Sequence, residues 1–162
     1  KKISEKINIA KTGADFPYND VSGKFEIAPI SSWTNGFYPG ILWLSYFASG
    51  DEAFKNVAVL LEEKLDIIIE SFKLPAHDVG FVWLLTSGIH YKLNKNDKSK
   101  MRLLKMANYL ASRFNIKGQF IRAWDGEWEK ASGVAIIDCM MNLPLLFWAS
   151  RELKDPRFSH IA

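Results

Sequence analysis

The sequence predicts an all-α protein. Apolar residues recur at helical spacing along most of the 162-residue chain, and several of these runs follow a residue typical of a helix amino-terminal cap. Strand-like alternation is weak and confined to residues 119–124. The length favours a single domain over residues 1–162. Within it, residues 1–32 are expected to form a helix and loop arm, because the stretch 11–34 is rich in Gly, Pro, Asn and Ser.

Two segments have the pattern of half-solvated helices. The first covers residues 54–68, with apolar residues on one face and charges on the other, and Asp51 precedes it as a good amino-terminal cap. The second covers residues 101–110 and opens after the polar stretch at Asp97. Both are expected to pack one face on a core and expose the other.

Three other segments are apolar on most sides and are expected to be more deeply buried helices. They cover residues 38–48, 80–93 and 138–153. Pro144 should kink the third helix or mark its first turn. Buried and amphipathic helices thus alternate along the chain. This order is typical of concentric helical hairpins, although a helical solenoid gives a similar pattern.

A further helix is expected to begin at Asp155-Pro156, just before the sequence stops. Five or six helices cannot close a double ring, and an open inner ring would expose a strongly apolar edge. The expectation is therefore an amino-terminal portion of a longer protein. The alternative is a short chain that closes by self-association.

Composition excludes several classes of function. The net charge of +3 is small and dispersed, so no nucleic-acid partner is expected. No apolar run is long enough for a membrane span. One cysteine, Cys139, excludes an internal disulfide and is expected to be an inert core thiol. Three scattered histidines give no metal-ligand spacing, so neither a metal nor a cofactor is expected. The compartment is left open between a bacterial cytoplasm and a periplasm.

Two acidic residues, Asp78 and Asp138, are the most informative feature. Each lies among aromatic, apolar or small residues rather than among other charges. A carboxylate in such a run is unfavourable by several kcal/mol unless it is paired, hydrogen-bonded or protonated. One interpretation is that each carboxylate caps a helix. The other is that the two belong to one site in which proton affinity is tuned.

Four blocks of the sequence together resemble the unsaturated glucuronyl hydrolases, glycoside hydrolase family 88. The blocks are Trp33-Thr34-Asn35-Gly36-Phe37-Tyr38-Pro39-Gly40, His77-Asp78-Val79-Gly80-Phe81, Ile121-Arg122-Ala123-Trp124 and Ile137-Asp138-Cys139-Met140-Met141-Asn142-Leu143-Pro144-Leu145-Leu146. The resemblance runs from Phe16 onward, in the family's order. The related unsaturated rhamnogalacturonyl hydrolases share two Asp but usually not the wording of the last block.

The resemblance implies an (α/α)6 barrel, of which this chain would form the first part. It also implies hydrolysis of oligosaccharides released by polysaccharide lyases, which carry a C4=C5 unsaturated uronic acid at the non-reducing end. Water adds across this vinyl ether, and the resulting hemiketal opens. The usual inference from carboxylate separation to stereochemical outcome therefore does not apply.

The resemblance assigns the acid/base role to Asp138 and an assisting role to Asp78. Protonating carbon needs a carboxyl group that keeps its proton near neutral pH. The Ile-Ile-Asp-Cys-Met-Met setting is expected to supply the desolvation, and the second carboxylate the like-charge repulsion. The expected substrate-binding residues are Trp33, Phe37, His77, Phe81, Trp124 and Asn142. Arg122 is a candidate counter-charge, with a structural ion pair as its alternative.

A different class of function is left open. The chain could be a carbohydrate-binding or structural helical fragment without catalysis. In the family, later helices supply further sugar contacts, so turnover by the isolated 162-residue piece is not assured.

Overall fold

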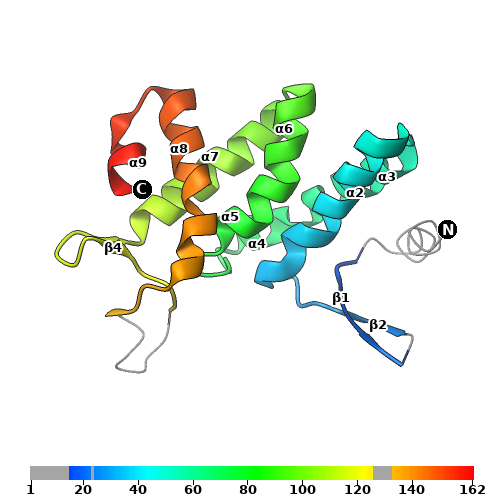
Figure 1. Cartoon of the computed structure of the whole chain (residues 1–162), viewed down its shortest axis with the longest axis horizontal. Coiled ribbons are helices and arrows are strands. Elements are labelled where there is room, and N and C mark those ends of the chain that lie inside the picture. Colours follow the sequence, from blue (N-terminus) through cyan, green and yellow to red (C-terminus); the bar gives the residue numbers. More distant parts are fainter. Residues whose placement is uncertain (1–14, 23, 126–132) are drawn as a thin grey trace. The chain divides into compact units, whose positions relative to one another are not determined.

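The computed structural model describes residues 15–22, 24–125 and 133–162, and the chain divides into two compact units, residues 1–74 and 75–162. Figure 1 shows helices in both units. The single domain over residues 1–162 stays a prediction. The first 14 residues of the expected arm lie outside the described residues.

The first unit corrects the expectation of a loop-like arm, because residues 17–27 form a β-hairpin. Strand β1 (Pro17–Val21) pairs antiparallel with β2 (Lys24–Ile27). The Ala28 N–H closes its base with a hydrogen bond of 2.8 Å to the Phe16 carbonyl. The four residues of β2 alternate polar and apolar, but the run is short and most of its side chains are exposed, so it gave little signal for a strand.

The helices of the first unit follow the predicted pattern. A 3-10 turn, η1 (Trp33–Gly36), leads into α2 (Phe37–Ser49), which packs against α3 (Glu52–Lys64), and α4 (Asp66–Glu70) follows. The Asp51 side chain accepts a hydrogen bond of 2.9 Å from the Ala53 N–H, which confirms it as the cap of α3. Between α2 and α3, Gly50 has φ +70°, a conformation that other residues rarely adopt.

The second unit begins with one long helical run that matches the predicted helix over residues 80–93. It consists of α5 (Val79–Trp83), a π-helical segment η2 (Leu84–Gly88) and α6 (Ile89–Asn94). The Thr86 hydroxyl donates to the Val82 carbonyl at 2.8 Å, one of the side-chain bonds known to distort helices. The run places Asp78 at its amino-terminal end.

Helix α7 (Asp97–Ser112) is the predicted amphipathic helix, and the Asn96 side chain caps it at 2.9 Å from the Ser99 N–H. Strands β3 (Phe114–Asn115) and β4 (Phe120–Ile121) then pair antiparallel, which confirms the short extended segment predicted near residue 120. In Figure 1, α7 runs beside α6 and α8, and it packs against both.

The last helices confirm the expectations for both prolines. Residues 138–153 are a 3-10 turn, η4 (Ile137–Met141), followed by α8 (Leu143–Leu153), and Pro144 stands in the first turn of α8. The Asp155 side chain caps α9 (Pro156–Ile161) through the Arg157 N–H at 3.0 Å. Among the described residues, no helix combines the length and hydropathy that a bilayer span requires.

A polar cluster joins α6, α7 and α8. Glu152 of α8 accepts hydrogen bonds from the Tyr91 hydroxyl at 2.8 Å and the Lys100 ammonium at 2.6 Å. These bonds, first that of Lys100, hold the pKa of the Glu152 carboxyl below its ordinary value. Stability from a lowered carboxyl pKa is present above the unfolded value, 4.5, and is lost as the pH falls through the folded value.

We therefore expect Glu152→Gln to destabilise the chain at pH 7 by about 1 kcal/mol or less, because the pair is partly exposed. The difference from wild type should shrink as the pH falls below 4.5. Urea unfolding at several pH values measures it. Lys100→Met should weaken the same pH dependence, because it removes the stronger partner. A constant difference between pH 7 and pH 3 would contradict this assignment.

Candidate active site

Asp78 stands at the amino-terminal cap position of α5 but does not act as its cap. Its side chain makes no capping hydrogen bond. The Oδ1 atom lies instead 3.0 Å from Nε2 of the His77 ring, and the side chain is 14% exposed. The helix-cap interpretation of Asp78 is therefore wrong, and its carboxylate is available for a site.

Asp138 lies in the first turn of η4, and Ile136 rather than Asp138 occupies the cap position. Its Oδ1 lies 3.3 Å from the same His77 Nε2 atom. The expected desolvation by its sequence neighbours is not observed. Ile137 is 85% exposed, Met140 and Met141 are exposed, and the Asp138 side chain itself is 43% exposed. Consecutive side chains of a 3-10 turn point in different directions. Apolar residues next to Asp138 in the sequence therefore need not cover its carboxylate.

His77 joins the two carboxylates. Its side chain has no exposed surface, and one of its nitrogens lies within 4.8 Å of an oxygen from each Asp, while those two oxygens lie within the same limit of each other. The two nitrogen–oxygen distances fall in the hydrogen-bond range. Neither oxygen, however, lies along the direction in which Nε2 would donate, and among the described residues no other group bonds to these three atoms. The arrangement is a buried three-centre contact.

Backbone contacts explain how residues distant in sequence meet at His77. The His77 N–H lies 3.4 Å from the Ala123 carbonyl, and the Ala123 N–H donates to the Val134 carbonyl at 2.9 Å. These bonds place the block 121–124 beside His77 and bring in the segment that leads to Asp138. Trp124, which is 38% exposed, follows directly after this contact.

Asn142 fixes the other side of the cluster. Its side chain is fully buried, and its Oδ1 accepts a hydrogen bond of 3.1 Å from the Phe81 N–H. Gly80 permits this approach, because a Cβ there would lie 2.5 Å from the Asn142 Cα and 2.6 Å from its Oδ1. The bond ties the start of α5, next to Asp78, to the junction of η4 and α8, next to Asp138. Asn142 thus acts between helices, a role that was not predicted from the sequence.

Arg113 holds the segment 122–125 in place, a role that was not predicted from the sequence. Its buried guanidinium donates to the carbonyls of Arg122 at 2.9 Å and Ala123 at 3.2 Å, and to the Asp125 carboxylate at 2.8 Å. Arg122 also pairs with Asp125, at 2.6 Å, which supports the structural alternative for Arg122. The sequence around Arg113, directly after an amphipathic helix, gives no indication of such a role.

We expect Arg113→Met to destabilise the chain by about 2–4 kcal/mol, because it leaves buried carbonyl groups unsatisfied. Thermal or urea unfolding measures this. Arg157→Met is the matched control, since Arg157 is solvated and its pair with Asp155 lies on the surface. The control should unfold close to wild type. Equal losses in the two variants would show that Arg113 is not an anchor.

Cys139 is the buried sole cysteine, and the two carboxylates affect it. Burial, then the charges of Asp138 and Asp78, raise the pKa of its thiol to about 11. The thiol is therefore protonated at neutral pH and is a poor nucleophile, as predicted. Its pKa also depends on the charge and position of both carboxylates.

The other predicted residues are placed as follows. Trp33 and Phe37 belong to the first unit, where their rings meet edge to face with centroids 5.8 Å apart, and both are exposed. His77, Asp78, Phe81, Trp124, Asp138 and Asn142 all belong to the second unit. The structure thus brings the two acidic residues together with His77, and links Phe81 to Asn142. No metal was expected, although His77, Asp78 and Asp138 form a possible donor set.

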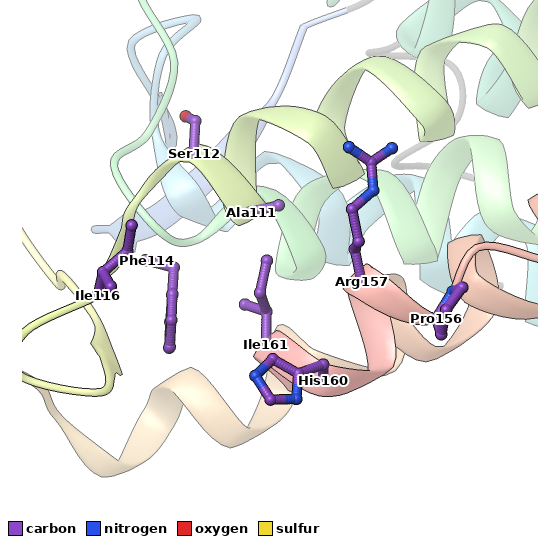
Figure 2. Close-up of a pocket in the computed structure, with 8 residues that line it drawn as sticks. All are labelled: Ala111, Ser112, Phe114, Ile116, Pro156, Arg157, His160 and Ile161. Carbon is purple, nitrogen blue, oxygen red and sulfur yellow. The ribbon is translucent and has the colours of Figure 1, made fainter.

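A groove of about 690 Å³ lies elsewhere in the second unit and contains none of these residues. Figure 2 shows its lining, from the end of α7, the segment after it, and α9. The lining is mostly apolar, and its titratable side chains are Arg157 and His160. It lacks paired carboxylates and is not the candidate active site.

Comparison with known proteins shows which enzymes the chain is similar to. No family model matches the chain. The chain is 34% identical over 158 residues to the unsaturated glucuronyl hydrolase of Bacillus sp. strain GL1, and 36% identical over 159 residues to the unsaturated chondroitin disaccharide hydrolase of Streptococcus pyogenes. These alignments cover 96% and 97% of the chain. The chain is a relative of the unsaturated glucuronyl hydrolases.

Solved structures of unsaturated glucuronyl hydrolases support the same relationship. That of Bacillus sp. GL1 superposes with a TM-score of 0.87 at 32% identity, over 96% of this chain and 42% of that one. A heparin-specific unsaturated glucuronyl hydrolase superposes with a TM-score of 0.78 at 33% identity. The predicted resemblance and the helical (α/α)6 architecture are therefore confirmed for the part that matches. The chain spans about two fifths of the length of its curated relatives.

Proposed function

We propose that the protein carrying this chain hydrolyses unsaturated uronyl oligosaccharides by hydrating the C4=C5 vinyl ether of the terminal sugar. The observation that carries the proposal is the convergence of Asp78 and Asp138, 60 positions apart, on one buried histidine nitrogen. A carboxylate pair of this kind suits proton transfer to and from a reacting sugar. The relationship to glucuronyl and chondroitin disaccharide hydrolases supplies the substrate class.

The exposures of the two carboxylates support different roles for them. Asp138 is the more open of the two and can reach a bound sugar, whereas Asp78 is mostly enclosed beside His77. Asp138 would give its proton to C4, which leaves oxocarbenium character at C5. The ionised Asp138 would then take a proton from the water that adds to C5. The hemiketal opens, and the aglycone leaves with the hydroxyl proton.

Aromatic and polar residues would hold the substrate. Trp124 is partly exposed and adjoins the backbone contact to His77, so it suits stacking on a flattened sugar ring. Trp33, Phe37 and Phe81 are proposed as further substrate-binding residues. Asn142 and His77 are fully buried, which favours support of the carboxylates over direct contact with sugar. One solved structure similar to this chain is a mutant of the Streptococcus agalactiae unsaturated glucuronyl hydrolase in complex with dGlcA-GalNAc6S.

The test measures loss of the ultraviolet absorbance of the C4=C5 bond, with the complete gene product that carries this chain. Unsaturated chondroitin and heparin disaccharides should lose the band, and a reaction in D2O should place deuterium at C4 at early times. Turnover of a rhamnogalacturonan-derived disaccharide alone would favour the rhamnogalacturonyl hydrolases. Binding of all these sugars without turnover would favour a carbohydrate-binding protein and overturn the proposal.

A further inference from the structure

We propose that His77 is a positioning residue whose ring lies against both Asp78 and Asp138 and fixes the distance between them. The inference rests on the proposed function for its kinetic consequences, but its geometric content stands apart from it. His77 had been expected to hydrogen-bond the substrate. Its position beside both carboxylates, with no exposed surface, supports a different role.

The ring of His77 contacts both carboxylates. Nε2 lies 3.0 Å from Asp78 and 3.3 Å from Asp138, so one ring nitrogen is in close contact with both carboxylates. Both carboxylate oxygens are buried, and among the described groups neither has a hydrogen-bond partner. Removing the ring leaves these two buried oxygens without the group that lies between them, and their separation should change.

Backbone contacts hold His77 in place. The His77 N–H meets the Ala123 carbonyl, which also accepts from the buried Arg113 guanidinium. Asp78 is the next residue in the chain, so its backbone is fixed with that of His77. Asp138 has no such covalent link, and its Oδ1 contact to Nε2 is the side-chain contact that ties it to this anchored pair.

The geometry allows a matched pair of substitutions. In His77→Gln the side-chain amide nitrogen can take the place of Nε2 beside both carboxylates. In His77→Asn the amide nitrogen reaches only the place of Nδ1, on the other side of the ring. Both substitutions replace the ring with a neutral amide, and the one methylene between them decides whether a nitrogen reaches the place of Nε2.

The kinetic readout is the division of the effect between kcat and KM in the complete gene product. We expect His77→Asn to lower kcat about 100-fold with little change in KM, because a displaced acid loses reactivity before binding fails. His77→Gln should keep kcat within about tenfold of wild type. Equal losses in the two variants, or a rise in KM with unchanged kcat, would overturn the positioning role. Circular dichroism should show that both variants remain folded.

The Cys139 thiol gives a second readout that needs no substrate. The charges of both carboxylates help to raise its pKa to about 11, so its alkylation rate against pH follows their position. His77→Asn should shift this alkylation profile, whereas His77→Gln should leave it near that of wild type. A shift in His77→Asn in a protein without turnover would reject the proposed function and keep the positioning role. Unshifted alkylation profiles in both variants would overturn the positioning role.

A chelator tests whether His77, Asp78 and Asp138 bind a metal ion instead. EDTA should leave kcat unchanged if His77 acts by bridging the carboxylates. Loss of activity on chelation, with return on adding Mn²⁺ or Zn²⁺, would make these residues metal ligands and overturn the proposal.

Discussion

Asp138→Asn is expected to abolish turnover while sugar binding persists. The substitution keeps the size and polarity of the side chain but removes the group that would donate a proton to C4 and later accept one from water. Positioned acid and base groups contribute about 10²–10⁴-fold, and Asp138 would serve in both steps, so we expect kcat to fall at least about 1,000-fold. The measurement is the loss of double-bond absorbance, with binding followed separately by calorimetry.

The control for this substitution is Asp97→Asn, which removes an exposed carboxylate in the same unit, in the first turn of α7. It should keep wild-type kcat and KM. Asp78→Asn should also lose activity but retain more than Asp138→Asn, because the enclosed carboxylate assists rather than transfers the proton. Full activity of Asp138→Asn would show that the roles are assigned wrongly.

Gly80→Ala is expected to reduce both stability and activity. The added methyl group would lie 2.5 Å from the Asn142 Cα, which is a backbone atom and cannot rotate away. Helix α5 must therefore move from the η4–α8 junction, and the hydrogen bond from Phe81 to Asn142 must stretch. We expect a loss of about 1–3 kcal/mol in unfolding free energy. The same movement separates Asp78 from Asp138, so kcat should fall about 100-fold.

Gly88→Ala is the matched control, since Gly88 lies in the same helical run as Gly80. A Cβ at Gly88 would meet the Trp83 carbonyl at 3.4 Å and Leu84 at 3.8 Å, which is ordinary contact. The control should be neutral, or stabilising by up to about 1 kcal/mol from helix propensity. The double variant Gly80→Ala/Asn142→Ala should not recover, because the added methyl group still meets the backbone at position 142. Wild-type melting and activity in Gly80→Ala would refute the close approach of α5 as the reason for this glycine.

Local signals predicted most of the helices. Asp51, Asp155 and Pro144 act at helix starts as their types suggest, because a cap or a first-turn proline depends on a few neighbouring backbone groups. The pairing of β1 with β2 was missed, because both strands are short and lie in a stretch rich in Gly, Pro, Asn and Ser. The π-helical segment was also missed, since no residue type specifies it uniquely.

The candidate site was predicted less completely. The identity of Asp78 and Asp138 followed from their unusual sequence setting and from the resemblance. The exposure of Asp138 did not follow, because the orientation of a side chain in a 3-10 turn depends on what packs against it. Arg113 was missed because its partners are backbone carbonyls, which look the same in every sequence.

Residues within one or two turns of each other were enough to specify the helical class, the positions of the caps and the two acidic residues in apolar surroundings. Packing between elements was needed to bring these acids together at His77, to clamp α5 to α8 through Gly80 and Asn142, and to place Cys139 where both charges raise its pKa. Such contacts join residues about 60 positions apart, and their distances depend on how whole helices pack, which no local pattern encodes.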